Sequence, residues 1–388
     1  YSIEGFRKHE CPPSLFLQNP YWPYFDQISS YVSRLSYALS QGKHDCKVGV
    51  YYPSRKACRL FSPLNHYAIR QIDECLDRLV AALLKKGIDF EFLNEDFLEK
   101  GKITSKGIRI DNDYAALVLP TSPDVDVQGI VEEFSKRGTL VILGEERGKE
   151  GRKNLFRYYE ENEAASFLAS KLDFGVYGEG VYCYSRKDAS SHWTFFLNAL
   201  DHPNVLRVKL EKGQRVERWN AEDGTVKVLA FAKKERIVKI PLGAKGSLLL
   251  SFAKGRAKAL RKETFVEYPL VLQEASFNGV KGSGISAHEN GIHHFDGKVV
   301  LTYAANLPEL PPRAKVELTG VMDFASVCCN GHDAGARLWA PFEFDLTPYL
   351  KTGENLIRIE ISNVKANAFE NADYDCGLKN PPSLRIGR

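Results

Sequence analysis

Apolar positions recur at helical spacing close to the start of the chain. The residues on this apolar face are Ile28, Tyr31, Val32, Leu35 and Leu39. Gly42 is placed to end the helix. Because no strand pattern precedes it, the helix has no packing partner of its own. The pattern therefore predicts that residues 1–45 are a terminal piece of a larger fold.

From residue 46 to about residue 172, short apolar runs alternate with helical stripes. The expected strands are Val48–Tyr52, Phe90–Leu93, Ala115–Leu119 and Leu140–Leu143. The expected helices are Ile69–Leu84, Val127–Phe134 and Ala164–Leu172. Apolar strands separated by helices indicate a parallel sheet that is covered on both faces.

After residue 175 the pattern changes to short strands bounded by turns. The clearest are Trp193–Leu197, Val205–Leu210, Val226–Phe231, Ser247–Phe252, Val299–Tyr303, Val316–Gly320 and Leu356–Ile361. Asp223-Gly224 and Asn330-Gly331 are typical of tight hairpin turns. The chain is therefore predicted to be a multi-domain protein that combines α/β and all-β parts, with a β-sandwich last. The predicted domains are 1–45, 46–175, 176–260 and 261–388.

The charge balance argues against one class of partner. The 388 residues include 53 basic and 49 acidic side chains, which are well mixed and give a net charge of +4. Nucleic acids are bound by a concentrated basic face, so no nucleic-acid partner is expected. No apolar run reaches the roughly 18 residues of a membrane span, so no membrane partner is expected either.

The first residue is Tyr1 and the only methionine is Met322, which predicts a processed, cut or incomplete N-terminus.

The eight cysteines form no C-x-x-C pair. Cys75 falls on the apolar face of an expected helix, and Cys328 and Cys329 fall in an expected strand. These positions favour buried free thiols, which are typical of a reducing compartment. A cytoplasmic location is therefore expected.

General catalytic signatures are missing from the sequence. It contains no Walker loop, no H-E-x-x-H, no zinc-type cysteine spacing and no G-x-S-x-G elbow. The α/β strands run into Tyr52-Pro53, Leu119-Pro120 and Leu143-Gly144, where no serine or cysteine nucleophile stands. We therefore expect the α/β layer to be a scaffold and expect no cofactor.

Two local features have a structural and a functional interpretation. His293 and His294, with His288 and Asp296 nearby, could be metal ligands. Neighbouring residues of a strand point to opposite faces, so a solvated loop is the better interpretation and no metal site is predicted. Trp219, just before a hairpin turn, is better explained by packing on a sheet than by stacking on a ligand.

The N-terminal stretch is rich in polar and aromatic residues. Residues 1–8 read YSIEGFRK and residues 18–24 read QNPYWPY. Charged side chains can hydrogen-bond the hydroxyls of a sugar while aromatic rings stack on its face. The stretch is therefore suited to a polyhydroxylated ligand.

Three segments carry a resemblance to a known family. Residues 19–23 (NPYWP), residues 31–42 (YVSRLSYALSQG) and residues 48–53 (VGVYYP) resemble the end of the catalytic barrel in glycoside hydrolase family 106 α-L-rhamnosidases. The resemblance implies that 1–45 is the remnant of a (β/α)8 TIM barrel, comprising the end of the last strand, a loop and the last helix. It also implies that 46–175 is a flavodoxin-type, glutamine-amidotransferase-like α/β domain.

The C-terminal half adds weaker signals to this resemblance. Residues 217–224 (ERWNAEDG) resemble a Trp-Asn-x-x-x-Gly hairpin in the β domain of these enzymes. Asn330-Gly331, residues 340–346 (APFEFDL) and Gly353-Glu354-Asn355 resemble the galactose-binding-like jelly roll also found in family 2 glycosidases. The resemblance implies such a jelly roll for 261–388.

The resemblance implies that the chain is the C-terminal part of an inverting glycosidase. Its substrate would be a rhamnose-containing glycan or glycoside, from which it removes terminal α-L-rhamnose or a similar sugar. Inversion needs two carboxylates about 6.5–9.5 Å apart. Glu4 is the catalytic candidate here, and its partner is expected outside this sequence, so the isolated chain is expected to be inactive. The implied substrate-binding residues are Tyr1, Ser2, Arg7, Tyr21 and Trp22.

Two alternatives remain open. The chain could be a non-catalytic carbohydrate-binding or structural module, with the α/β domain mediating subunit contacts. It could also be an amidotransferase-type enzyme that uses the α/β layer, although the missing nucleophile elbow disfavours this. The sequence leaves the oligomeric state undecided.

Overall fold

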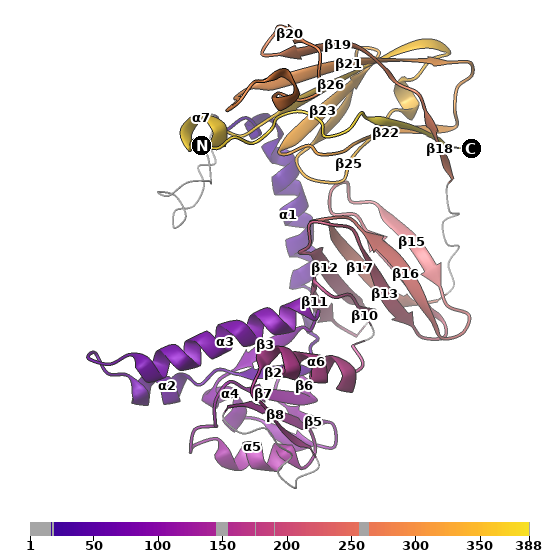
Figure 1. Ribbon diagram of the computed structural model, residues 1–388. Coiled ribbons are helices and arrows are strands. Elements are labelled where there is room, and N and C mark those ends of the chain that lie inside the picture. The colour runs from indigo at the N-terminus through magenta and orange to yellow at the C-terminus, as the bar shows by residue number, and fades with distance from the viewer. Residues whose placement is uncertain are drawn as a thin grey trace. The chain divides into compact units, whose positions relative to one another are not determined.

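The computed structural model describes residues 17, 19–144, 154–174, 176–189, 191–255 and 264–387 (Figure 1). The chain forms two compact units. Unit 1 comprises Tyr1–Val32 with Arg261–Arg388, and unit 2 comprises Ser33–Leu260. The boundary falls within helix α1 (Phe25–Ser40). The finer division into four domains stays a prediction.

Unit 2 contains a five-stranded parallel sheet. Its order is β3 (Phe90–Leu93), β2 (Val48–Tyr51), β7 (Ala116–Leu119), β8 (Thr139–Leu143) and β9 (Leu155–Tyr158). Every neighbouring pair is parallel, which confirms the expectation from the apolar runs. Strand β9 was not expected, because its four residues include an arginine and no apolar run.

Helices cover both faces of this sheet (Figure 1). On one face, α3 (Tyr67–Lys85) and α6 (Glu161–Lys171) bury leucines such as Leu79 and Leu168 against the strands. On the other face, α5 (Gln128–Ser135) buries Phe134. That second core also includes residues of α4 (Glu95–Glu99) and of a small sheet made of β4 (Lys102–Thr104), β5 (Gly107–Arg109) and β6 (Asp113–Tyr114).

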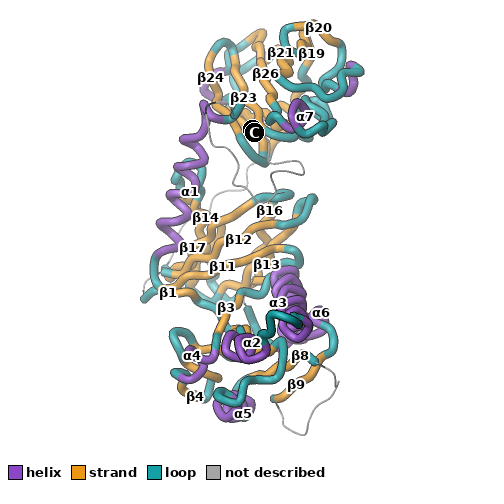
Figure 2. The backbone as a smooth tube through the Cα atoms, turned by 90° about the vertical axis from the view of Figure 1, so that its left-hand side faces the viewer, coloured by secondary structure: helices purple, strands orange, loops and turns teal. Residues whose placement is uncertain are grey.

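Two antiparallel sheets complete unit 2 (Figure 2). The larger has the order β1 (Lys43–His44), β11 (Val181–Lys187), β12 (His192–Asn198), β17 (Ser247–Lys254), β14 (Gln214–Trp219) and β15 (Val226–Phe231). The smaller has the order β10 (Val176–Tyr177), β13 (Asn204–Leu210) and β16 (Arg236–Leu242). Buried residues of both sheets, such as Leu206 and Leu250, form one core. The expected hairpin joins β14 to β15, with Gly224 at a φ of +77°.

The last turns of α1 pack within unit 2. Leu35, Ala38 and Leu39 form a cluster whose other members are Trp193, Phe195, Trp219 and Leu249 of the larger antiparallel sheet. Arg34 Nη1 also donates to the carbonyl oxygen of Ala221 over 2.9 Å. This half of the helix therefore has a packing partner, contrary to the expectation from the sequence. Trp219 packs on the sheet, as expected.

Unit 1 is built on two antiparallel sheets. The first has the order β20 (Val280–Gly282), β19 (Val271–Phe277), β21 (Lys298–Leu307), β26 (Gly353–Ser362), β23 (Phe324–Cys329) and β24 (His332–Arg337). The second has the order β18 (Phe265–Tyr268), β27 (Ser383–Gly387), β22 (Arg313–Leu318) and β25 (Phe342–Asp345). Leu301 and Ile359 of the first sheet share a buried core with Val316 and Phe344 of the second. The predicted two-sheet packing is therefore present.

Two asparagines, one fully buried and one half-buried, fix the turns at one end of unit 1. Asn355 is fully buried, and its Nδ2 donates to the carbonyl oxygens of Lys351 and Gly353 over 2.7 and 2.9 Å. Its Oδ1 accepts from Asn330 Nδ2 over 2.8 Å. Asn330 and Gly331 both have positive φ, as a tight two-residue turn requires. The Asn330-Gly331 turn and the Gly353-Glu354-Asn355 segment, both singled out in the sequence, are thus joined by one side-chain hydrogen bond.

Within the described parts of the chain, no helix combines the length and the apolar character that crossing a membrane requires. The seven described cysteines are all free. Of the three cysteines expected to be buried, Cys329 is buried, whereas Cys75 and Cys328 are only half-buried. Cys46 and Cys376 are also buried, and Cys58 is exposed.

Candidate functional site

Most of the predicted site residues lie outside the described part of the chain. These are Tyr1, Ser2, Glu4 and Arg7. Tyr21 and Trp22 are described, at the start of the short 3-10 helix η1 (Trp22–Tyr24). Tyr21 is half-buried, and this burial raises the pKa of its hydroxyl. Trp22 is 40% exposed and stacks on Phe25, with 5.3 Å between the ring centroids.

Other residues of the same loop line a cavity on unit 1. The cavity measures about 330 Å³, and Pro20, Pro23 and Tyr24 form one wall. The opposite wall comes from the ends of β21, β23 and β26 and includes Phe324, whose ring meets the Tyr24 ring edge-on at 6.0 Å. The loop that the sequence singled out therefore does contribute to a cavity, but through different residues.

A second cavity, of about 630 Å³, lies over the outer face of the first sheet of unit 1. Its polar lining consists of Glu274, Ser276, Asn278, Lys298, Thr302, Arg358 and Glu360. Lys298 and Glu360 line both cavities, so we treat the two together as the sheet groove. Glu360 accepts from Lys298 Nζ over 3.4 Å and also pairs with Arg358.

The sheet groove offers the chemistry that sugar recognition uses. Carboxylates, ammonium groups and hydroxyls can hydrogen-bond a polyhydroxylated ligand, and the rings of Tyr24 and Phe324 stand at one end. The sequence analysis did not select Lys298, Phe324 or Glu360. The available signal was the alternation along β21 and β26, which places polar residues on one face of each strand.

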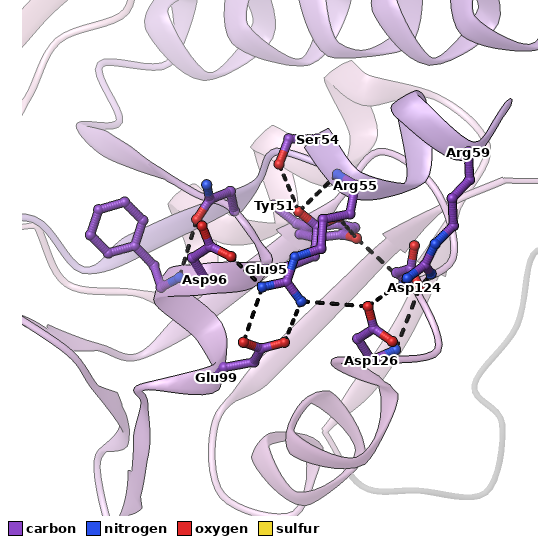
Figure 3. Close-up of polar contacts among 11 residues, drawn as sticks. Tyr51, Ser54, Arg55, Arg59, Glu95, Asp96, Glu99, Asp124 and Asp126 are labelled. Carbon is purple, nitrogen blue, oxygen red and sulfur yellow. Dashed lines mark hydrogen bonds and ion pairs between the residues drawn. The ribbon is translucent and has the colours of Figure 1, made fainter. Parts of the chain in front are cut away.

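The carboxyl edge of the parallel sheet is the usual ligand site in folds of this topology. The strand order 2-1-3-4-5 places the switch point between β2 and β7. Figure 3 shows what occupies this edge. Glu95 is fully buried there, and it accepts from Tyr51 Oη and from Ser54 Oγ, each over 2.8 Å. Burial alone would raise the pKa of Glu95, but hydrogen bonds from Tyr51, Ser54 and backbone amides outweigh it and lower the pKa.

Arginines of α2 (Ser54–Leu60) form ion pairs with the other carboxylates at this edge (Figure 3). Arg55 pairs with Asp96, Glu99 and Asp126. Arg59 pairs with Asp124 and Asp126. Two guanidinium groups thus serve four carboxylates, so the edge has no net positive field to attract a phosphate or carboxylate ligand. We call this set of residues the edge network.

The thiol nearest to this edge is unsuited to nucleophilic attack. Cys75 Sγ lies 3.4 Å from the carbonyl oxygen of Pro120, directly after β7. Burial, followed by the charge of Glu161, raises the pKa of Cys75 to about 12. A thiol with this pKa stays protonated at neutral pH and is a poor nucleophile. The geometry therefore favours a scaffold over an amidotransferase-type site.

Unit 2 also contains a cleft of about 1080 Å³. Its ionisable lining includes Asp45, Asp89 and His192. His192 Nε2 lies 3.6 Å from the nearest carboxylate oxygen of Asp45, too far for a hydrogen bond, and burial lowers the pKa of His192. Asp89 is occupied by His44 Nε2 and by the backbone amide of Ser185, each at 3.0 Å. These groups therefore serve the structure of the cleft wall and do not form an acid–base pair.

Two clusters among the described residues have metal-ligand composition. The first comprises His44, Cys46 and Glu91. Burial raises the pKa of the Cys46 thiol, His44 Nε2 lies 3.0 Å from Asp89 and Glu91 accepts from Tyr114 Oη over 2.6 Å, so these side chains are engaged within the protein. The second comprises His288, His293 and Asp373 in unit 1.

Comparison with known proteins places the fold. No protein-family model matches the sequence, and no curated protein matches it. Among solved structures, the chain is similar to a rhamnosidase from Novosphingobium sp. PP1Y, with 14% identity and a TM-score of 0.64. That similarity covers 96% of this chain and 42% of the rhamnosidase chain. A GH42 β-galactosidase from G. stearothermophilus also matches, with 10% identity over 65% of this chain and 47% of its own, but its TM-score is only 0.43.

These likenesses concern the fold. At 14% identity, the likeness to the rhamnosidase shows that this mixed α/β and β chain shares the fold of part of a glycoside hydrolase. The chain spans 42% of the length of the rhamnosidase that it matches.

Proposed function

We propose that this chain is the C-terminal part of a glycoside hydrolase that removes terminal α-L-rhamnose or a similar sugar with inversion. The observation that carries the proposal is the similarity to a rhamnosidase structure over 96% of the chain. It is supported by the segments at residues 19–23, 31–42 and 48–53, which resemble family 106 α-L-rhamnosidases.

The proposal assigns a part to each region. Residues 1–45 close a catalytic (β/α)8 barrel, 46–175 form a glutamine-amidotransferase-like scaffold, 176–260 form a small β domain and 261–388 form a galactose-binding-like jelly roll. The edge network supports the scaffold role, because it fills the usual ligand site of such a sheet with internal ion pairs.

The chemistry needs two carboxylates. One carboxylic acid protonates the leaving oxygen, and the other carboxylate activates a water molecule on the opposite face of the sugar. Glu4 is our candidate for one of them, with its partner supplied by barrel strands beyond this sequence. Tyr1, Ser2, Arg7, Tyr21 and Trp22 would contact the sugar around it.

The test compares the 388-residue chain with the protein encoded by the whole reading frame. We expect the whole protein to hydrolyse aryl α-L-rhamnosides and to release β-rhamnose first, as inversion requires, measured by proton NMR. The chain alone should show no turnover. Turnover by the chain alone, or a whole protein that cleaves no aryl glycoside in a panel of sugars, would contradict the proposal.

A second candidate function is non-catalytic sugar binding, which the sheet groove favours. Glu360 lines both cavities of the groove, whereas Glu354 lies exposed on the same strand outside it. If the groove binds sugar, L-rhamnose at millimolar concentration should shift NMR signals of the chain. Glu360→Gln should weaken this binding, and the matched variant Glu354→Gln should leave it unchanged. If millimolar L-rhamnose shifts no NMR signal of the chain, this candidate function is contradicted.

A further inference from the structure

Two loops of unit 1 bring a pair of histidines onto one carboxylate. His288 begins the 3-10 helix η2 (His288–Asn290), and His293 follows in the next loop. Asp373 lies 80 residues beyond His293 in sequence, after α7 (Ala366–Phe369). His288 Nε2 is 3.0 Å from Asp373 Oδ1, and His293 Nδ1 is 2.9 Å from Asp373 Oδ2. The two imidazole rings lie 5.0 Å apart.

These spacings are close to those of a metal site. Zn²⁺ binds imidazole nitrogen and carboxylate oxygen at about 2.0–2.2 Å, so two ligand atoms of a tetrahedral ion lie about 3.3 Å apart. The two nitrogen–oxygen distances, which end on different oxygens of Asp373, are each a few tenths of an ångström shorter than this value. The three ligand atoms lie within 4.8 Å of one another. The His293 side chain is 64% exposed, so it is free to close the remaining distance.

The backbone holds the carboxylate in place. The amide of His294 donates to Asp373 Oδ1 over 2.7 Å, and the amide of His288 donates to Asp375 Oδ1 over 2.9 Å. His294 and Asn371 both adopt positive φ, a costly conformation for residues other than glycine, on either side of the cluster.

We propose that His288, His293 and Asp373 form a binding site for one divalent transition-metal ion, of which Zn²⁺ is the representative. Two imidazoles and one carboxylate leave a fourth position for water, and the ion would join the loop after η2 to the segment that precedes β27. Asp296, the acidic residue nearest to His293 in sequence, pairs instead with Lys365 Nζ at 2.8 Å. The proposal rests on unit 1 alone and is independent of the proposed function.

Isothermal titration of the metal-free chain with Zn²⁺ tests the site. We expect one Zn²⁺ per chain and a higher melting temperature in its presence. Removing a group that only orients a metal ligand lowers metal affinity by about 10–100-fold. His288→Ala and His293→Ala each remove a ligand itself, so each should lower the affinity for Zn²⁺ by at least that factor. His66→Ala, which removes an exposed histidine of unit 2, is the matched control and should leave binding unchanged.

Substitution with Co²⁺ gives a second readout. The visible absorption of tetrahedral Co²⁺ should appear when the chain is titrated with Co²⁺, and it should be absent in His293→Ala. Because the His293 side chain is exposed, its substitution should not unfold the chain, so misfolding would not explain the lost absorption. Absence of Zn²⁺ heat with excess metal, or full binding by the His288→Ala, His293→Ala double variant, would overturn the proposal. Variants that lower the melting temperature by the same amount with and without Zn²⁺ would also overturn the proposal. That result is expected if the cluster is only a structural set of hydrogen bonds.

Discussion

At the residue scale, Glu95 is the most constrained charge of the edge network. It is fully buried, and its two oxygens accept from Tyr51, Ser54 and the backbone amide of Arg55. Removing a buried acceptor leaves these donors without a partner, which costs more than the hydrogen bond itself contributed.

We predict that Glu95→Gln lowers the free energy of unfolding by about 1–3 kcal/mol at pH 7. Glu99→Gln, which removes a half-exposed partner of Arg55, should cost only about 0–1 kcal/mol. Urea unfolding followed by circular dichroism measures both. If the two variants lose the same free energy of unfolding, the burial of Glu95 does not increase its contribution to stability.

The same residue predicts a pH dependence. The pKa of Glu95 is lower in the folded chain than its ordinary value, so its ionised form stabilises the fold at neutral pH. This contribution is complete above the unfolded pKa, about 4.3, and is lost as the pH falls through the folded pKa. The stability difference between the wild-type chain and Glu95→Gln should therefore shrink below pH 4. A difference that stays constant down to pH 2 would contradict this.

The sequence predicted the roles of single residues poorly, because the residues that they contact are distant in the chain. It placed His293 beside Asp296, the nearest carboxylate, whereas the folded chain places it on Asp373. Glu95 gave no signal at all, since its role depends on Tyr51 and Ser54 at the end of another strand. Only the geometry of the fold brings such groups together.

At the element scale, regular apolar periodicity was a reliable guide. The stripe from Ile69 to Leu84 appears as α3, and Gly87 has the positive φ expected just beyond a helix end. Helix α2 was missed, because its sequence SRKACRL has no apolar stripe and its N-terminus has no side-chain cap. The short strands β4 to β6 were missed for the same reason: two or three residues are too few to show a period.

The end of α1 gives a test at this scale. Ala38 is 2% exposed and packs with Trp193 and Leu249, so there is no room for a larger side chain. We predict that Ala38→Leu destabilises the chain by about 1–3 kcal/mol through overpacking. Ser36→Leu, on the exposed side of the same helix, should change stability little. Urea unfolding followed by tryptophan fluorescence measures both, and equal stability of the two variants would contradict this packing.

At the scale of the whole molecule, the sequence predicted the order of the α/β and β regions along the chain. It did not predict which strands pair with one another in each sheet. Strand β22 lies between β25 and β27, and β1 pairs with β11 more than 100 residues away in sequence. Such pairings depend on long-range contacts that no local pattern encodes. The sheet groove went unrecognised for this reason, since its walls come from strands that are distant in the chain.

Thiol reactivity tests burial across the chain. We predict that, among the described cysteines, Cys58 reacts fastest with a thiol reagent at pH 8, because it is exposed. Burial raises the pKa of Cys75 and Cys183 to about 12, which leaves almost no thiolate at that pH. In a Cys11→Ser background, Cys58→Ser should abolish the fast phase and Cys75→Ser should preserve it. A fast phase that survives Cys58→Ser would contradict the burial pattern.

The edge network also limits how this scaffold could be engineered. A designer who wants to install a new ligand pocket at the switch point must first remove side chains that already pair with one another. Removing Asp126 alone would leave Arg55 paired with Asp96 and Glu99, and Arg59 paired with Asp124, whereas removing Arg55 would take away the arginine that pairs with both Asp96 and Glu99. A substitution of Arg55 should therefore be combined with substitutions of the acids that it pairs with, whereas an exposed acid such as Glu99 can be varied singly.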